Sequence, residues 1–225
     1  MFGARRGLRD ISTTLKNQIY SELTRRGIAY EPGCLSTKKE RSWVQATLTD
    51  CRVQALLRQL DLLEEGRARY NKEVLLPKYN LSAEAQLLAT IPGVGYYTAL
   101  TAAAFIGDAR RFRESDALIS YAGLAPRVSQ PSSSLHLGPI TKAGPHLLRW
   151  VLHEAFQMHR LHCPTKDTCQ LCTFYRRVCR RRGKYKAVTA GAAKLLRVMY
   201  WMLKMNEPYH PQGLEPRKGT EGEPR

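Results

Sequence analysis

The sequence predicts an all-α fold, and three observations support this prediction. Apolar residues recur three or four positions apart in most segments, as they do on one face of a helix. Serine, proline and glycine stand where these segments would begin and end. No segment alternates apolar and polar residues as a half-buried strand does. We expect a helical arm over residues 1–80, a compact helical domain over residues 81–204 and a disordered tail over residues 205–225.

The arm is expected to contain two long helices joined by a loop. The first covers residues 10–27 and stops at Gly27, a natural helix terminator. The second extends from Cys51 to about Val74. Its apolar seam consists of Val53, Leu56, Leu57, Leu60 and Leu63. Such a seam is typical of a coiled-coil arm and equally of one helix in a bundle, and the periodicity does not separate the two.

Six further helices are expected in the compact domain, where capping residues mark several ends. Ser82 can cap the first of them, and Gly107 can end the second. The predicted helices cover residues 82–90, 96–107, 115–123, 145–160, 174–183 and 187–204. The segment 124–144 carries three prolines and has no helical period, so it is expected to be irregular.

The charge of the chain points to an anionic partner. It has 36 Lys and Arg residues against 19 Asp and Glu residues, a formal net charge of +17. Nucleic acid is the first candidate and an anionic membrane surface is the second. No apolar run approaches the roughly 18 residues of a membrane span, and the first ten residues lack the apolar core of a signal peptide. The sequence therefore predicts a cytoplasmic protein without a membrane partner, whose cysteines are thiols or metal ligands.

The stretch TIPGVGYYTA, residues 90–99, places two glycines around Val94 between two predicted helices. Glycine has no Cβ, so the backbone at Gly93 and Gly95 can approach a ligand closely. The helix that begins at Tyr96 directs its free N–H groups toward the same place, which favours a phosphate. The pattern resembles the helix-hairpin-helix motif, which grips a DNA backbone. The alternative is a glycine-rich turn without a ligand.

A second candidate nucleic-acid site is the basic stretch RRVCRRRGKYK. Its seven cations are Arg176, Arg177, Arg180, Arg181, Arg182, Lys184 and Lys186. They would repel one another without anions, so we expect them to neutralise phosphates, with Tyr175 and Tyr185 available to stack on bases. The alternative is a solvated charged face.

Four cysteines follow one another as C-x5-C-x2-C-x6-C. They are Cys163, Cys169, Cys172 and Cys179, and His159 and His162 lie just before them. Four thiolates can form a tetrahedral zinc site, of which C-x2-C is a usual half. The alternative is a set of buried free thiols, since the second half of the pattern is less regular than a zinc knuckle.

Three motifs together make the chain resemble insertion-sequence transposases of the IS110 type (IS116/IS110/IS902). They are IPGVGYYTA, F-x5-L-x-S-YAGLAP and G-x-ITK-x-G, and the resemblance runs from about Leu15 to Leu203. It implies a prokaryotic, nucleoid-associated DNA recombinase that assembles through its helical arm as a homo-oligomer and is guided by an RNA. It also implies a RuvC-like acidic domain that binds divalent metal, and a serine nucleophile in the C-terminal part.

The sequence departs from the family pattern in two places. It starts where the family's helical arm begins, so the acidic domain is expected to be missing and the chain to be a truncated copy. Pro131 stands at the expected serine, which leaves Ser132 and Ser133 as candidate nucleophiles. The cations and proton acceptors available to that loop are Arg127, Lys142 and His136. The alternative function is a non-catalytic helix-hairpin-helix module that binds DNA or RNA.

Overall fold

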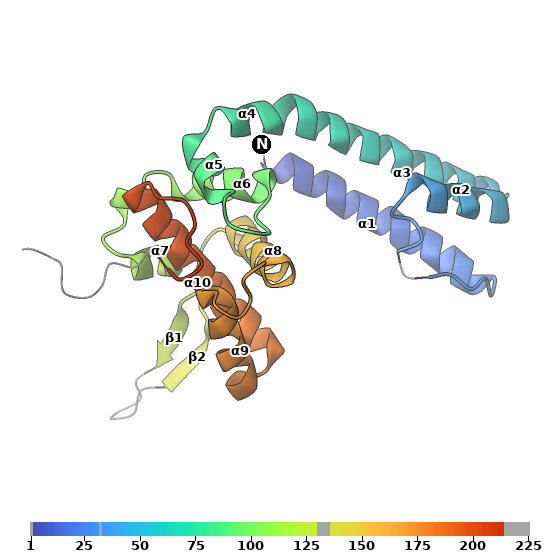
Figure 1. The fold of residues 1–225 in the computed structure, drawn as a ribbon. Helices are drawn as coiled ribbons and strands as arrows, with labels where there is room; N and C mark the ends of the chain where they lie inside the picture. Colours follow the sequence, from blue (N-terminus) through green and yellow to red (C-terminus); the bar gives the residue numbers. More distant parts are fainter. Residues whose placement is uncertain (1, 32, 130–135, 214–225) are drawn as a thin grey trace, which may run out of the picture. The chain divides into compact units, whose positions relative to one another are not determined.

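A computed structural model describes residues 2–31, 33–129 and 136–213 of the chain (Figure 1). The chain divides into two compact units, residues 1–77 and residues 78–225. The described residues are mainly helical, and their only strands form one two-stranded sheet. The predicted all-α class is therefore confirmed as the dominant architecture. None of the helices in the described ranges is long and apolar enough to cross a membrane.

The first unit is built on a pair of long helices, α1 (Phe2–Arg25) and α3 (Cys51–Tyr70), which pack against each other. The predicted seam of α3 is buried at Val53, Leu57 and Leu60, with Leu56 and Leu63 half-buried beside it. The short α2 (Lys38–Thr47) is held at its start by a capping box between Thr37 and Glu40. A π-helical turn (Asn71–Leu75) and α4 (Leu76–Asn80) continue α3.

The second unit contains two short helices, α5 (Ala83–Leu88) and α6 (Tyr96–Ile106), followed by a 3-10 turn (Ala109–Arg111) and α7 (Ser115–Tyr121). Three longer helices complete it: α8 (His146–His162), α9 (Gln170–Arg182) and α10 (Lys184–Met205). The apolar face of α10 contacts α5, α7, α8 and α9, so this helix is the centre of the core. Ser82 caps α5 as predicted, because its side chain accepts a hydrogen bond from the Ala85 N–H.

The segment 124–144, predicted to be irregular, contains a β-hairpin. Strand β1 (Pro126–Ser129) pairs antiparallel with β2 (His136–Ile140), and the register shifts between Pro126 and Val128. Strand β1 (PRVS) alternates over only four residues, the shortest run that indicates a strand, and β2 (HLGPI) does not alternate. A proline is tolerated at the start of a strand or on an edge, and both strands of a two-stranded sheet are edges. The prolines therefore did not exclude strands here.

The C-terminal segment after α10 also differs from expectation over its first residues. Residues 206–213 belong to the predicted disordered tail, but they form hydrogen bonds with the second unit. The Gln170 N–H donates to the Pro211 carbonyl over 2.8 Å, and the Tyr209 N–H donates to Thr90 Oγ1 over 2.9 Å. The polar composition of this segment predicted disorder, because composition does not reveal hydrogen bonds to distant residues.

Candidate nucleic-acid interface and metal centre

The glycine turn joins α5 to α6 and is anchored in the core. Ile91 and Val94 are buried, and their side chains hold the turn against the core. The Val94 N–H donates to the Ile91 carbonyl over 3.0 Å and closes the turn. The structure therefore contains two helices joined by the predicted glycine turn.

The two glycines have different surroundings. Gly93 has a φ of +85°, and a Cβ there would lie 2.4 Å from the backbone nitrogen of His159. This glycine therefore lets the turn pack directly on α8. Gly95, by contrast, is exposed, and a Cβ there would meet no atom within 4 Å. Only Gly95 faces open space.

Gly95 is also the N-cap of α6 and offers no side chain to its N–H groups. The first turn of a helix has no intrahelical acceptors for its N–H groups, and its positive dipole end attracts anions. Tyr96, the first residue of α6, is half-buried, and its ring packs edge-on against Tyr79 at 6.3 Å between centroids. The open backbone at Gly95 is thus the part of the turn that a phosphate can approach.

The motifs YAGLAP and ITKAG meet backbone to backbone. A Cβ at Gly144, where φ is +142°, would lie 2.1 Å from the Tyr121 carbonyl oxygen. Arg149 of α8 fastens the junction, because its Nη1 donates to the carbonyls of Ala122 (3.2 Å) and Gly144 (2.8 Å). The glycine of ITKAG is explained by this close approach.

Two predicted phosphate ligands lie at this junction. Arg127, on β1, is exposed and reaches the Thr141 carbonyl at 3.5 Å. Lys142 is exposed and has a φ of +56°, which is uncommon for a residue with a side chain. Its N–H donates to the Gly123 carbonyl over 3.0 Å, which holds that conformation. The two cations therefore flank the base of the hairpin.

The candidate nucleophiles Ser132 and Ser133, together with Pro131, lie outside the described residues. They fall between Ser129 at the end of β1 and His136 at the start of β2. His136 is part of β2 and pairs with Ser129 in the register.

The basic stretch forms the end of α9, Gly183 and the start of α10 (Figure 1). All seven predicted cations are exposed. Arg176 already has an anionic partner, because its Nη1 lies 2.6 Å from Asp167 Oδ1. Arg177 stacks over the Phe174 ring at 5.6 Å. The other five are Arg180, Arg181, Arg182, Lys184 and Lys186, and in the described part of the chain no acidic side chain forms an ion pair with any of them.

Tyr185 lies at the turn of this basic hairpin and is 89% exposed. An aromatic ring so far out of the core contributes little to packing. Since Lys184 and Lys186 flank it, the ring and the two cations present a surface suited to a base and its phosphates.

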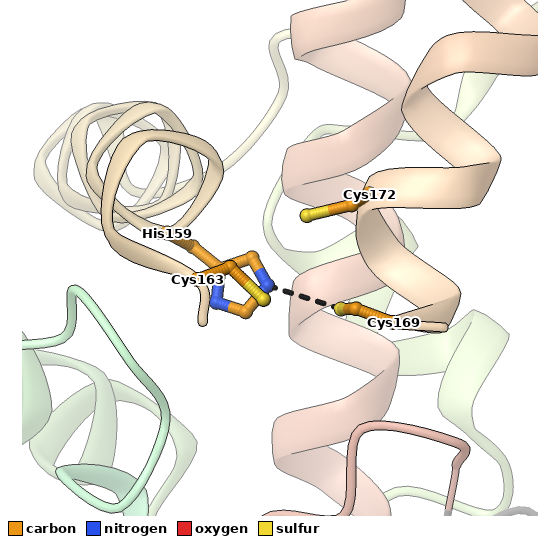
Figure 2. A group of neighbouring side chains, drawn as sticks. All are labelled: His159, Cys163, Cys169 and Cys172. Carbon is orange, nitrogen blue, oxygen red and sulfur yellow. Dashed lines mark hydrogen bonds between the residues drawn. The ribbon is translucent and has the colours of Figure 1, made fainter. Parts of the chain in front are cut away.

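Four side chains of types that can bind a metal gather where α8 ends and α9 begins. They are His159, Cys163, Cys169 and Cys172, and Figure 2 shows them pointing toward one another. Their four ligand atoms lie within 4.8 Å of one another, and all four residues are buried. Figure 2 also marks the hydrogen bond between His159 Nε2 and Cys169 Sγ, which are 3.3 Å apart.

The local fold explains how these side chains converge. His159 and Cys163 are four residues apart, so they lie on one face at the end of α8. The Cys169 N–H donates to the Thr165 carbonyl over 2.8 Å, which turns the chain into α9. Cys169 is the N-cap of α9 and Cys172 lies one turn later. The C-x2-C half-site is thereby directed at the end of α8.

The thiols of the cluster have strongly perturbed pKa values. Burial raises the pKa of Cys169, but hydrogen bonds with the side chains of His159 and Tyr209 and with the backbone of Cys172 and Leu171 lower it to about 6. Burial, together with negative charge on Cys169 and Cys163, raises the pKa of Cys172 to about 12. Burial and the neighbouring Cys169 also raise the pKa of the Tyr209 phenol. Without a cation, the negative charge of one thiolate in this cluster therefore disfavours ionisation of the next thiol.

The cluster corrects the predicted set of four cysteines. Cys179 is not part of it, and its Sγ lies 3.8 Å from the Tyr175 hydroxyl instead. Cys179 lies seven positions after Cys172, about 10 Å along a helix, which is too far for one ion. His159 replaces it as the fourth member. The signal for it was its position one helical turn before Cys163.

Comparison with known proteins gives a consistent result. Residues 85–169 match the family described as the Transposase IS116/IS110/IS902 family. This region contains the glycine turn, the β-hairpin and the first three members of the metal cluster. The resemblance predicted from the motifs is therefore confirmed for this region.

Individual relatives carry related names. The chain is 32% identical over 126 residues, 56% of its length, to the transposase for insertion sequence element IS1111A of Coxiella burnetii. It is 27% identical over 201 residues, 83% of its length, to a probable family 20 transposase of Pseudomonas aeruginosa. It is 34% identical over 132 residues, 57% of its length, to the pilin gene-inverting protein of Moraxella lacunata. The matches span 34%, 59% and 39% of these three relatives' own lengths, respectively.

Proposed function

We propose that the chain acts in DNA transposition or inversion and that its second unit binds the DNA backbone. The observation that carries this proposal is the family match over residues 85–169. That match covers both the open glycine turn and the junction that holds Arg127 and Lys142. The names of the relatives, which include transposases and a gene-inverting protein, support the same reaction class.

The second unit offers two kinds of contact to a DNA backbone. The N–H groups at the start of α6 can donate hydrogen bonds to a phosphate oxygen at the exposed Gly95. The five cations around Gly183, which form no ion pair with any described acidic residue, can neutralise further phosphates. Both kinds of contact are independent of base sequence, so this unit supplies affinity and position.

The proposed chemistry is transfer of a DNA strand through a serine that lies between β1 and β2 in the sequence. The Oγ of Ser132 or Ser133 would form a bond to phosphorus while the bond from phosphorus to a sugar oxygen breaks. A base takes the hydroxyl proton, and the leaving sugar oxygen receives one. Arg127 and Lys142 would stabilise the negative charge that develops on the phosphate oxygens. Divalent metal on a RuvC-like acidic domain would assist, as the family resemblance implies.

Two further partners follow from the same proposal. A guide RNA would select the DNA, and a second copy of the chain would associate through the helical arm. The first unit exposes Ile11 (52%) and Leu62 (68%), which are apolar side chains available to such a contact. Light scattering of the purified chain measures self-association directly, and a monomer at all concentrations would remove the arm from this role.

The second candidate function is a non-catalytic module that binds DNA or RNA. The exposed Tyr185 between two lysines favours it, because aromatic stacking suits unpaired bases. Strand-transfer assays with element DNA and divalent metal separate the two functions. A product that Ser132→Ala and Ser133→Ala together abolish supports the recombinase, whereas binding without any product supports the module.

The binding proposal is tested with a pair of matched double variants. Arg180→Ala with Lys184→Ala removes two cations of the basic hairpin, and Arg110→Ala with Arg113→Ala removes two exposed cations elsewhere in the same unit. Fluorescence anisotropy with a DNA duplex should show weaker binding for the first variant only. Equal affinities for both variants would contradict a role of the hairpin in DNA binding.

A further inference from the structure

We propose that His159, Cys163, Cys169 and Cys172 bind one structural zinc ion that holds the glycine turn in place. The argument for this ion does not rest on the proposed DNA binding, and it uses residues that the proposed function leaves unexplained. Its ligand set, three thiolates and one imidazole, is one of the usual combinations for structural zinc.

The spacing of the ligand atoms fits a tetrahedral ion. With Zn–S bonds of about 2.3 Å, the sulfur atoms of a tetrahedral site lie about 3.8 Å apart. The four atoms here lie within 4.8 Å of one another, so displacements of about 1 Å, within the range of side-chain rotation, bring them to that distance. They come from two helix ends and surround a common point, as Figure 2 shows.

The hydrogen bonds around His159 prepare it as a ligand. Its Nδ1 lies 2.8 Å from the Pro92 carbonyl oxygen, which can only accept, so the proton resides on Nδ1. The lone pair is then on Nε2, the atom that faces Cys169. Metal-binding histidines usually donate their other ring N–H to a carbonyl or a carboxylate in this way.

The sulfur of Cys169 is prepared in a comparable manner. The Tyr209 hydroxyl lies 3.1 Å from Cys169 Sγ, and the N–H groups of Leu171 and Cys172 point to the same atom. Donors of this kind stabilise a thiolate. The cluster therefore has ordered donors around its ligands, which a set of packed free thiols does not require.

The types of ligand, and the complete coordination of the ion by protein side chains, indicate zinc in a structural role. Three thiolates favour a soft or borderline metal over magnesium or calcium, which prefer oxygen ligands. Four protein side chains complete a tetrahedron and leave no position for substrate or water. All four residues are buried, so a bound ion would be shielded from solvent.

The ion would connect three segments that are distant in sequence. It would join the end of α8 to the start of α9 across residues 164–168. Through His159 and the Pro92 carbonyl it would reach the glycine turn, whose Gly93 packs on the same residue. Through Tyr209, whose N–H also donates to Thr90, it would reach the C-terminal segment.

The test is the zinc content of the purified full chain. The chain is passed through gel filtration, and its zinc is then measured by elemental mass spectrometry. We expect one zinc per chain for the wild type. Cys163→Ser and Cys172→Ser should lose most of it, while Cys179→Ser should keep it. The last variant is a matched control, because it removes a neighbouring cysteine that lies outside the cluster.

A second measurement remains informative if the ligand variants do not fold. Cobalt(II) added to the zinc-free wild-type chain should give the visible absorption of a tetrahedral thiolate complex at one equivalent. Zinc added afterwards should bleach it. A wild type without zinc and without this cobalt spectrum, or a Cys179→Ser variant that loses zinc as Cys172→Ser does, would overturn the proposed site.

Discussion

Replacing Gly93 by alanine should destabilise the second unit, because this glycine is fixed both by its conformation and by its contact. At a φ of +85°, an alanine costs roughly 1–2 kcal/mol relative to glycine. Its Cβ would also lie 2.4 Å from the His159 nitrogen, and such overpacking against backbone costs about 1–3 kcal/mol. The two effects together predict a loss of about 2–5 kcal/mol.

Thermal unfolding followed by circular dichroism measures this loss. For a unit of this size, about 2–4 °C are lost per kcal/mol, so Gly93→Ala should lower the Tm by roughly 4–20 °C. Gly95→Ala is the matched control, since its φ of −81° suits any residue and its Cβ would meet open space. We expect that variant to remain within about 1 kcal/mol of the wild type, the cost of a poorer N-cap.

The opposite order would refute the reasoning. If Gly95→Ala destabilised the chain more than Gly93→Ala, the turn would not pack on α8 through Gly93. Equal and small effects would show that neither glycine is constrained. The comparison uses no nucleic acid, so its outcome depends only on the packing of the turn.

Three further predictions concern the motif junction, the arm and the basic hairpin. Arg149→Ala should cost about 1.5–3 kcal/mol in thermal unfolding, because two carbonyls lose a charged donor, and an unchanged Tm would contradict this. Capping hydrogen bonds with Thr37 lower the pKa of Glu40, and a hydrogen bond from Arg26 lowers the pKa of Asp50. Each ionised carboxylate therefore stabilises the folded state fully above its unfolded pKa of about 4. This stabilisation is lost as the pH falls through the lowered pKa values of the folded state. Thermal unfolding of the wild type should therefore lose more stability between pH 5 and pH 3 than that of the Glu40→Gln, Asp50→Asn double variant; parallel curves would argue against these caps. Tyr185→Ala should weaken single-stranded DNA binding about 5- to 150-fold without changing the circular dichroism, whereas unchanged affinity would exclude stacking by this ring.

The sequence was sufficient for the parts of the fold that depend on local pattern. The seam around Val53 and Leu60 was predicted because helical periodicity places these residues on one face, and burial follows from that. The Ser82 cap was predicted for a similar reason, since a cap and the helix it starts are neighbours in sequence. The family resemblance rested on the same kind of evidence, three motifs read along the chain.

Features that depend on distant segments could not be obtained in this way. Spacing alone suggested Cys179 as the fourth metal ligand, because a sequence does not show that α9 carries it about 10 Å beyond Cys172. His159 joins the cluster only because α8 ends opposite the start of α9. The role of Gly93 was likewise hidden, since the atom it must avoid belongs to a residue 66 positions later.

The central claim, that the second unit binds the DNA backbone through its basic hairpin, is tested most directly by the salt dependence of binding. Each phosphate contact contributes about 0.9 to the slope of log affinity against log salt for duplex DNA. We predict a steep negative slope for the wild type and a slope shallower by about 2 for the variant with Arg180→Ala and Lys184→Ala. An unchanged slope in that variant, or no DNA binding by the wild type at low salt, would contradict the claim.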